Sequence, residues 1–331
     1  MNIDIYKEIQ KEYEDKREYA ISVAEGKKEE AYIKYPKLKE IDTKIRRLGI
    51  EASKNALFPK DIEKQNRNKE IFSEIDNLKK EKESILNKSK FGITPTYECE
   101  KCKDTGYVSK GFETLMCSCM KQKLIDVAFN KSNLNKLKND SFETFNDMYY
   151  SNEADIQKFG EKISPRDNIL KIKERLIEFV NNFDNPNTKS VILIGTPGVG
   201  KTFLSSCVAN AILKNGYTVL YQTAPLLLDS IFEYKYGSSF KSGKQFYEDI
   251  FHVDLLIIDD LGTETSTEAK YSELLNIINT RLLNSNTKTL ISSNLSLSDI
   301  KKKYDHRLFS RIVGEYDKYR IIGDDIRLKV K

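Results

Sequence analysis

A glycine-rich octapeptide directly after a short apolar run is the feature that most constrains how this 331-residue chain can fold. Residues 195–202 read GTPGVGKT and fit the pattern GxxxxGK followed by Ser or Thr, and residues 190–194 before them read SVILI. The pattern needs a strand before it and a helix after it, because its backbone N–H groups must curve around phosphate oxygens at a helix N-terminus. The predicted nucleotide-binding residues are Gly195, Thr196, Pro197, Gly198, Val199, Gly200, Lys201 and Thr202.

The end of this loop and a later strand supply the expected chemistry. We expect Lys201 to reach the β- and γ-phosphates and the Thr202 hydroxyl to ligate Mg²⁺. Residues 255–260 read LLIIDD, and an apolar strand that ends in two acids places both at the carboxyl edge of a sheet. Asp259 is predicted to hold Mg²⁺, directly or through water, and Asp260 to polarise the attacking water. Many P-loop ATPases have Glu where Asp260 stands, so the shorter side chain predicts slow or regulated hydrolysis.

Asn294 ends the apolar run KTLISSN at residues 288–294. Its side chain is predicted to reach the γ-phosphate or to orient the attacking water, and the alternative is a simple helix N-cap region. No Asn or Thr followed by KxD stands after a strand beyond the phosphate loop, which favours ATP over GTP.

Three arginines are candidates for contact with the γ-phosphate. Arg307 and Arg311 are four residues apart and share one face of a predicted helix. We expect Arg311, more than Arg307, to reach the γ-phosphate of a neighbouring subunit as an arginine finger, and the alternative is a surface ion-pair partner. Arg327 is predicted to return to the phosphates of its own subunit.

Apolar runs alternate with helical patterns from residue 166 onward, which predicts a parallel sheet buried on both faces. The predicted strands are residues 190–195, 218–222, 254–260 and 288–294. The predicted helices are the stretches around residues 201–214, 225–235, 268–284 and 298–312. The fold class is therefore α/β, and residues 166–331 are predicted to form one nucleotide-binding domain. Residues 123–165 are predicted to be a short helix and a linker.

Four of the five cysteines crowd into residues 91–122. Cys99 and Cys102 form one close pair, and Cys117 and Cys119 form a second after an intervening loop. Two such pairs supply the four thiolates of a structural zinc site, so these residues are predicted to form a small zinc-binding module. The alternative is four reduced cysteines in a loop. The fifth, Cys207, is predicted to be a buried core residue.

Residues 1–90 carry apolar side chains at alternating spacings of three and four, which is typical of helices that pack as in a coiled coil. Gly49 and Pro59 fall between the two patterned stretches and are predicted to turn the chain. The two alternatives are a helical hairpin that only packs on itself and a helical arm that grips a partner protein. The patterned residues are Leu38, Ile41, Ile45 and Leu48 in the first stretch and Ile71, Ile75, Leu78, Lys82 and Ile85 in the second.

The composition narrows the choice of partners. A net charge of +5 permits a nucleic-acid partner without requiring one. No apolar run approaches the ~20 residues of a membrane span, so we expect no membrane partner. The polar N-terminus lacks an apolar signal-peptide core, and we expect a cytoplasmic location. Tyr234, Tyr236, Phe240 and Phe246 interleave with lysines, which is compatible with single-stranded DNA binding or with ordinary core packing.

Five elements together resemble bacterial replicative helicase loaders of the DnaC/DnaI type and the related transposition ATPases of the IstB type. They are GTPGVGKT, LLIIDDLG, TLISSNLS, HRLFSRIVGEYDKYRIIGDDIR and the cysteine module with CKDTGY. The resemblance covers about residues 95–331 and implies a P-loop AAA+ ATPase domain with a reduced C-terminal lid. It also implies a helical N-terminal region that contacts the hexameric replicative helicase, and an ATPase domain that binds single-stranded DNA.

The resemblance assigns roles to individual residues. It implies that Lys201 and Thr202 are Walker A residues and that Asp259 and Asp260 are the Walker B acids. The remaining assignments are Asn294 as sensor 1, Arg311 as the arginine finger and Arg327 as sensor 2.

The leading hypothesis is therefore an ATPase that uses ATP, Mg²⁺ and Zn²⁺ and self-associates through its ATP site. It would deliver the replicative helicase onto single-stranded DNA, and hydrolysis would then release it. A second hypothesis is a transposition helper that acts on double-stranded DNA. A third is an adaptor that does not hydrolyse ATP, in which the zinc module and the helical arm carry the function.

Overall fold

The computed structural model describes residues 3–58, 61–89, 92–111, 113–127, 139–236, 243–265, 267–304 and 306–328. The chain divides into two compact units, one of Met1–Ile9 with Ser109–Lys331 and one of Gln10–Val108. Among the described helices, none combines the length and the apolar character that a membrane crossing demands.

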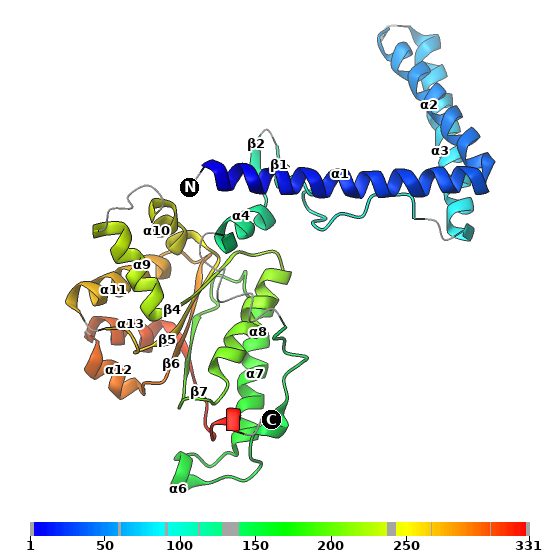
Figure 1. Cartoon of the computed structure of the whole chain (residues 1–331). Coiled ribbons are helices and arrows are strands. Elements are labelled where there is room, and N and C mark those ends of the chain that lie inside the picture. Colours follow the sequence, from blue (N-terminus) through cyan, green and yellow to red (C-terminus); the bar gives the residue numbers. More distant parts are fainter. Residues whose placement is uncertain are drawn as a thin grey trace. The chain divides into compact units, whose positions relative to one another are not determined.

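A five-stranded parallel sheet forms the centre of the larger unit (Figure 1). Its strand order is β4-β5-β6-β3-β7, so the first strand of the sheet in the sequence lies between the last two. Strand β3 pairs regularly with both neighbours, with Ile192 opposite Ile291 of β6 on one side and Lys318 of β7 on the other. The strands are β3 (Ser190–Ile194), β4 (Val219–Thr223), β5 (Leu255–Leu261), β6 (Lys288–Ser293) and β7 (Tyr316–Arg320).

Helices cover both faces of the sheet, which explains why its inner strands are apolar throughout. Val191 and Leu193 of β3 pack toward α7 and α8, whereas Ile192 and Ile194 pack in the cluster formed with α9 to α13. Figure 1 shows these helices on opposite sides of the sheet. Their bounds are α7 (Pro165–Asn181), α8 (Lys201–Lys214), α9 (Ala224–Tyr236), α10 (Gly243–His252), α11 (Glu268–Leu282), α12 (Leu297–Lys303) and α13 (His306–Glu315).

The sheet and its flanking helices confirm the predicted α/β fold class, although helices α7 and α10 were not predicted. The helix predicted around residues 298–312 is two helices, because the chain turns to an extended conformation at Tyr304 and buries that side chain. Strand β7 was not predicted. Its sequence, YDKYR, is largely polar because β7 lies at the edge of the sheet, where side chains face solvent.

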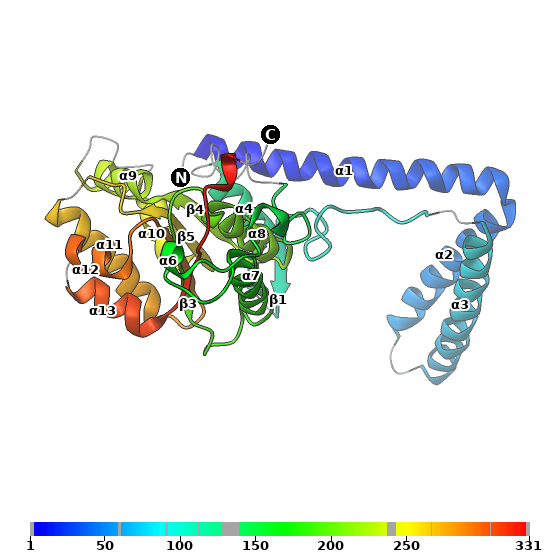
Figure 2. The ribbon, with the colours of Figure 1, turned by 90° about the horizontal axis from the view of Figure 1, so that it is seen from below.

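The N-terminal helices are α1 (Ile3–Lys34), α2 (Pro36–Ala56) and α3 (Ile62–Ser89). Figures 1 and 2 both show α2 and α3 side by side. Leu48, Ala52 and Ile71 form their buried contact. Ion pairs Lys37–Glu81, Lys44–Glu74 and Arg67–Glu51 join the two helices in antiparallel register.

The turn between α2 and α3 lies after residue 56. Gly49 is inside α2 rather than at a turn, because the helix continues for two more turns beyond it. The prediction that Gly49 turns the chain is therefore wrong, and Pro59 lies outside the described residues.

The cysteine-rich segment contains β1 (Tyr107–Lys110), β2 (Glu113–Met116) and α4 (Ser118–Ile125). Gln122 of α4 satisfies the free backbone edge of β4, since its side chain accepts from Val219 N at 2.7 Å and donates to Val219 O at 3.0 Å. Three short helical segments, η2 (Asp147–Tyr149), α6 (Ile156–Phe159) and η3 (Ile326–Leu328), complete the described elements.

Candidate nucleotide-binding site

The phosphate loop connects β3 to α8, as the motif predicts. Gly198 and Gly200 have φ angles of +79° and +93°, in the left-handed region that favours glycine. A side chain at Gly195 would meet the carbonyl oxygen of Ile321 at 2.6 Å. Gly198 and Gly200 are therefore required by the backbone conformation of the loop, and Gly195 by the close approach of the chain after β7.

Lys201 begins α8 and is buried. Its Nζ donates to the carbonyl oxygens of Gly195 at 2.8 Å and Thr196 at 2.9 Å, and to Asn294 Oδ1 at 2.6 Å. Burial lowers the pKa of Lys201, while the Asp260 and Asp259 carboxylates oppose that shift. The ammonium is thus held over the loop by polar oxygens that a bound phosphate can replace.

Asp259 is buried in β5 and accepts hydrogen bonds from three hydroxyl groups. It accepts from Thr202 Oγ1 at 3.1 Å, from Tyr221 OH at 2.8 Å and from Ser292 Oγ. Hydroxyl and carboxylate oxygens are the ligands that Mg²⁺ prefers, so Thr202 and Asp259 fit the predicted magnesium site. Sequence reasoning missed Tyr221 and Ser292, although both lie on strands adjacent to β5 in the sheet.

Asp260 has a φ of +55°, which is uncommon for a residue with a side chain. Its backbone N–H donates to Ser292 Oγ at 3.0 Å, and Asn294 Nδ2 donates to its Oδ1 at 3.5 Å. Burial raises the pKa of Asp260 and the charge of Asp259 raises it further, whereas Lys201 acts in the opposite direction. Asn294 therefore bridges Lys201 and Asp260, where a residue that senses the γ-phosphate would lie.

The chain after β7 returns to the phosphate loop. Ile326 N donates to Gly198 O at 3.0 Å, and a side chain at Gly198 would lie 1.9 Å from Asp325 Oδ1. Arg327 is exposed and forms a two-point ion pair with Asp325, with Nε–Oδ1 at 2.9 Å and Nη2–Oδ2 at 2.6 Å. This ion pair raises the pKa of Arg327, and the Arg327 charge acts on Lys201 and Asp260 as well.

Tyr150 supports the loop from the side and was not predicted. Its buried hydroxyl donates to Val199 O at 3.0 Å, and a side chain at Gly200 would meet that hydroxyl at 2.5 Å. The ring stacks on Phe145, with ring centres 6.0 Å apart. Burial raises the pKa of Tyr150 to about 12, so the hydroxyl stays protonated at neutral pH. No motif or periodicity distinguishes this tyrosine in the sequence.

The predicted arginine finger lies on α13. Arg311 is exposed, and its side chain makes no hydrogen bond or ion pair with another described residue. Arg307 is also exposed and lines a pocket with Tyr271 of α11 and Lys303 of α12. Cys207 is buried on α8, as predicted.

The four clustered cysteines converge on one point. The Sγ atoms of Cys99, Cys102, Cys117 and Cys119 all lie within 4.8 Å of one another. Asp104 stabilises the turn that holds Cys99 and Cys102. Its carboxylate accepts hydrogen bonds from Cys99 N at 2.8 Å and from Glu98 N at 2.9 Å. Four convergent thiols fit the tetrahedral ligand set of a structural zinc ion.

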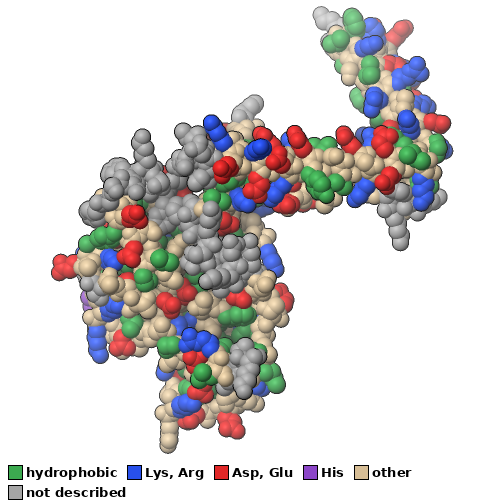
Figure 3. All heavy atoms as spheres, in the orientation of Figure 1, with side chains coloured by type: hydrophobic (Ala, Val, Ile, Leu, Met, Phe, Trp, Pro, Cys, Tyr) green, Lys and Arg blue, Asp and Glu red, His purple; other side chains and the backbone are tan. Residues whose placement is uncertain are grey.

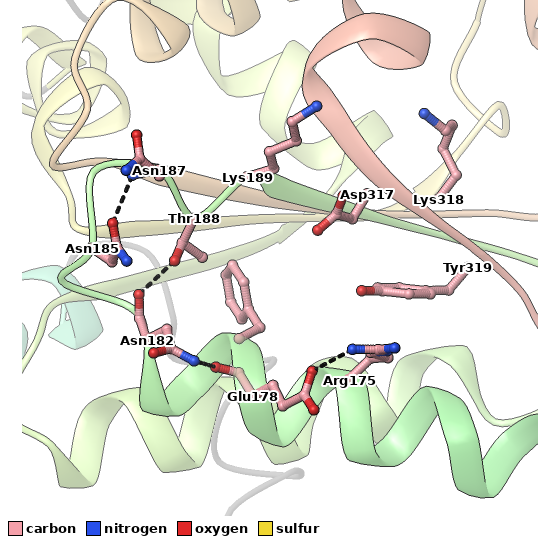
Figure 4. Close-up of a pocket in the computed structure, with 11 residues that line it drawn as sticks. Arg175, Glu178, Asn182, Asn185, Asn187, Thr188, Lys189, Asp317, Lys318 and Tyr319 are labelled. Atoms are coloured by element: carbon pink, nitrogen blue, oxygen red, sulfur yellow. Dashed lines mark hydrogen bonds and ion pairs between the residues drawn. The ribbon is translucent and has the colours of Figure 1, made fainter.

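A second pocket lies at the opposite edge of the sheet (Figure 4), because its lining includes Thr188 and Lys189 just before β3. Arg175 pairs with Glu178, three residues further along α7, at 2.8 Å. Lys189 and Lys318 already donate to backbone carbonyls, so the pocket's cations are engaged. We therefore assign the nucleotide to the edge that carries the phosphate loop.

This site is that of a P-loop nucleotide-binding domain. It combines a phosphate loop with a buried lysine, a hydrogen-bonded threonine and aspartate, and a polar residue after β6. Residues 163–331 match the family model of IstB-like ATP-binding proteins, and the chain belongs to that family.

Sequence comparison with individual proteins confirms the predicted resemblance to helicase loaders. The chain is 30% identical over 152 residues to the replicative helicase loader DnaC of Escherichia coli (strain K12), which covers 43% of this chain and 60% of that protein. It is 32% identical over 136 residues to DnaC of Buchnera aphidicola subsp. Baizongia pistaciae, covering 41% and 54%. The chain thus spans little more than half the length of these relatives. A crystal structure of the DnaC helicase loader gives a TM-score of 0.45 at 22% identity, covering 56% of this chain and 99% of that one.

Proposed function

We propose that this protein is an ATP-dependent loader that binds a hexameric replicative DNA helicase and delivers it onto single-stranded DNA during replication initiation or restart. The observation that carries the proposal is the convergence of Lys201, Asn294 and Asp260 beside the Thr202–Asp259 pair. It occurs in a chain that is 30% identical over 152 residues to a replicative helicase loader. ATP hydrolysis would release the loader from the helicase.

The residues of the site support ATP hydrolysis. Lys201 would exchange its carbonyl partners for phosphate oxygens, and Asn294 would orient water between the γ-phosphate and Asp260. Mg²⁺, when bound at Thr202 and Asp259, would neutralise charge on the phosphates. Asp260 would accept the proton of that water, because Asn294 holds its carboxylate beside the site that the γ-phosphate would occupy.

Arginines would link the nucleotide to assembly. Arg311 is exposed on α13, where it can face a second subunit. We propose that it reaches the γ-phosphate of a neighbour, so that self-association completes the site. Arg327 would leave Asp325 for the phosphates of its own subunit, because a γ-phosphate offers more negative charge than one carboxylate.

Helix α2 supports the proposed contact of residues 1–90 with the helicase. Ile50 and Leu57 are 54% and 76% exposed on the face turned away from Leu48, and Gly49 leaves open space beside them. Figure 3 shows hydrophobic side chains among mixed charges along the N-terminal helices. Basic residues flank this face, so it fits an apolar helicase surface with acidic neighbours. Its lining residues are Arg46, Gly49, Ile50, Ser53, Lys54 and Leu57.

Co-purification with the cognate helicase tests this function. The full chain should retain the helicase with ATP and release it with ADP. Substitution Leu57→Asp should abolish retention and leave nucleotide binding intact, while Phe72→Asp, at an exposed apolar site on α3, is the matched control. Equal retention by both variants would contradict the role of α2, and failure of the unmodified chain to retain the helicase would contradict the loader function.

Two substitutions test the ATP site directly. Lys201→Ala should abolish nucleotide binding, with Lys214→Ala at the far end of α8 as the control. Arg311→Ala should spare nucleotide binding and remove DNA-stimulated hydrolysis, because an arginine supplied in trans contributes about 10³–10⁵ in kcat. Unchanged stimulation in Arg311→Ala would refute its assignment.

The family match favours one other candidate, an IstB-like transposition helper that acts on double-stranded DNA. Binding of single-stranded and double-stranded DNA in the presence of ATP separates the two. Preference for the single strand supports the loader, and preference for the duplex supports the helper.

A further inference from the structure

A buried carboxylate that the nucleotide site does not use lies four residues after Asp260. The Glu264 side chain is 0% exposed, and it accepts from Gly262 N at 2.9 Å and from Tyr304 OH. Lys303 Nζ lies 3.4 Å from its Oε1. Burying an ionised carboxylate costs several kcal/mol unless the group is paired and hydrogen-bonded. Glu264 is paired with Lys303, and both of its oxygens accept hydrogen bonds.

Glu264 and Lys303 together fix the turn that follows β5. Lys303 donates to Gly262 O, while Gly262 has a φ of +110° and packs under Leu295. The same turn holds Asp260, because the Thr263 N–H and hydroxyl both donate to Asp260 O, at 3.2 and 2.8 Å. The backbone that carries the Walker B carboxylate is therefore tied to the end of α12.

Tyr304, the hydroxyl partner of Glu264, lies close in sequence to α13, the helix that carries Arg311. Tyr304 follows α12 directly and lies two residues before α13 begins at His306, and its ring packs edge-on against Tyr271 of α11. Burial and the Glu264 carboxylate raise the pKa of Tyr304, so its hydroxyl remains a donor at neutral pH. Glu264 thus joins the turn beside Asp260 to the point where the chain enters α13.

We propose that Glu264 is a positioning residue that holds α13 in register with the Walker B turn, so that Arg311 is presented correctly to the neighbouring subunit. The inference rests on the proposed trans role of Arg311 and adds the residue that enforces it. A subunit without Glu264 keeps both Thr263 hydrogen bonds to Asp260 O, so it would still bind and hydrolyse ATP when a neighbour supplies an arginine. It would fail as the arginine donor.

Subunit mixing tests this division of labour. Glu264→Ala alone should bind ATP with an affinity within about twofold of the unmodified protein. Its DNA-stimulated kcat should fall about 100-fold, because a displacement of about 1 Å costs that much. Mixed with excess Asp260→Asn subunits, which keep Arg311 but lack the Walker B acid, it should recover most of the lost kcat. Absence of recovery, or loss of ATP binding, would overturn the proposal.

Controls separate this inference from the proposed function and from misfolding. Arg311→Ala mixed with Asp260→Asn must also recover, and if it does not, the trans arginine itself is wrong. Tyr304→Phe removes only the hydroxyl that binds Glu264 and keeps the ring against Tyr271. It should show the same donor defect, to a smaller degree, in a protein with an unchanged circular dichroism spectrum.

Glu315→Gln, at an exposed position of α13, should behave as the unmodified protein. Intact donor function in both Glu264→Ala and Tyr304→Phe would refute the role of Glu264.

Discussion

Asp259 and Asp260 are adjacent in sequence and have opposite environments. Asp259 is buried and accepts from three hydroxyls, whereas Asp260 is half-buried and has one amide donor at 3.5 Å. The difference arises where the β5–β6 pairing is irregular between Ile258 and Leu261, and where Asp260 takes its φ of +55°. These environments support the proposal that Asp259 holds magnesium and that Asp260 acts on water.

The raised pKa of Asp260 predicts a stability change of definite sign. In the nucleotide-free protein the charged carboxylate is less favourable than in the unfolded chain, so the fold loses stability as pH rises from the ordinary aspartate pKa to the raised folded pKa. Asp260→Asn should therefore raise the melting temperature at neutral pH, and the gain should vanish below the ordinary aspartate pKa. Thermal melts across this pH range measure it.

Asp299 supplies the control of opposite sign. Its hydrogen bonds with Ser296 in the capping box of α12 lower its pKa. Asp299→Asn should lower the melting temperature at neutral pH, with the loss disappearing as pH falls. If both aspartate substitutions shift the melting temperature in the same direction, the electrostatic account of Asp260 fails.

At the scale of elements, a buried arginine joins α11 to the sheet. Arg281 donates to the carbonyl oxygens of Ile250 and Lys288, both at 2.7 Å, and to Thr289 Oγ1 at 3.0 Å. Burial lowers its pKa to about 10. Arg281→Met should reduce the free energy of unfolding by about 3–5 kcal/mol, because it leaves buried carbonyls without donors. Denaturant unfolding measures the loss, and one below about 1 kcal/mol would contradict it.

The contact between α2 and α3 offers a matched pair of neighbours. Ile71 is fully buried against Leu48 and Ala52, whereas Phe72 is 61% exposed. Ile71→Ala should destabilise the hairpin by about 2–5 kcal/mol, and Phe72→Ala should change its stability by less than about 0.5 kcal/mol. Circular dichroism melts of the full chain, with nucleotide binding as the unaffected readout, would check this. Equal effects would mean that the coiled-coil spacing does not identify the buried face.

At the scale of the whole molecule, the cysteine cluster and the nucleotide site are separate stretches of one chain. Four thiolates within 4.8 Å predict one zinc ion per chain, bound without a catalytic role. A strong chelator should release one equivalent of zinc and unfold the module, because metal binding and folding are coupled in such sites. ATP binding should persist. A metal-free protein with an unchanged melting profile would rule out structural zinc.

Cys102→Ser is the genetic counterpart of chelation. It removes one buried thiol ligand. The zinc content should fall, and the fraction of protein with a folded cysteine module should fall with it. Cys207→Ser is the matched control, because Cys207 is buried on α8, far from the other four cysteines in sequence. It should leave the zinc content unchanged.

The sequence alone determined the features that depend on local spacing. The phosphate loop, its flanking strand and helix, the LLIIDD strand and the paired cysteines were all predictable, because backbone geometry and ligand chemistry demand those residues in that order. The stripe that includes Leu48 and Ile71 was readable for the same reason, since one helix face repeats at a fixed interval.

Only the tertiary structure decided which distant residues meet. Tyr150 on Val199, Gln122 on β4, Asp325 beside Gly198 and Glu264 on Tyr304 join segments that are 40 to more than 100 residues apart. Strand β7 escaped prediction because an edge strand need not be apolar. These contacts depend on the order of strands in the sheet and on the packing of helices over it, and a local pattern contains neither.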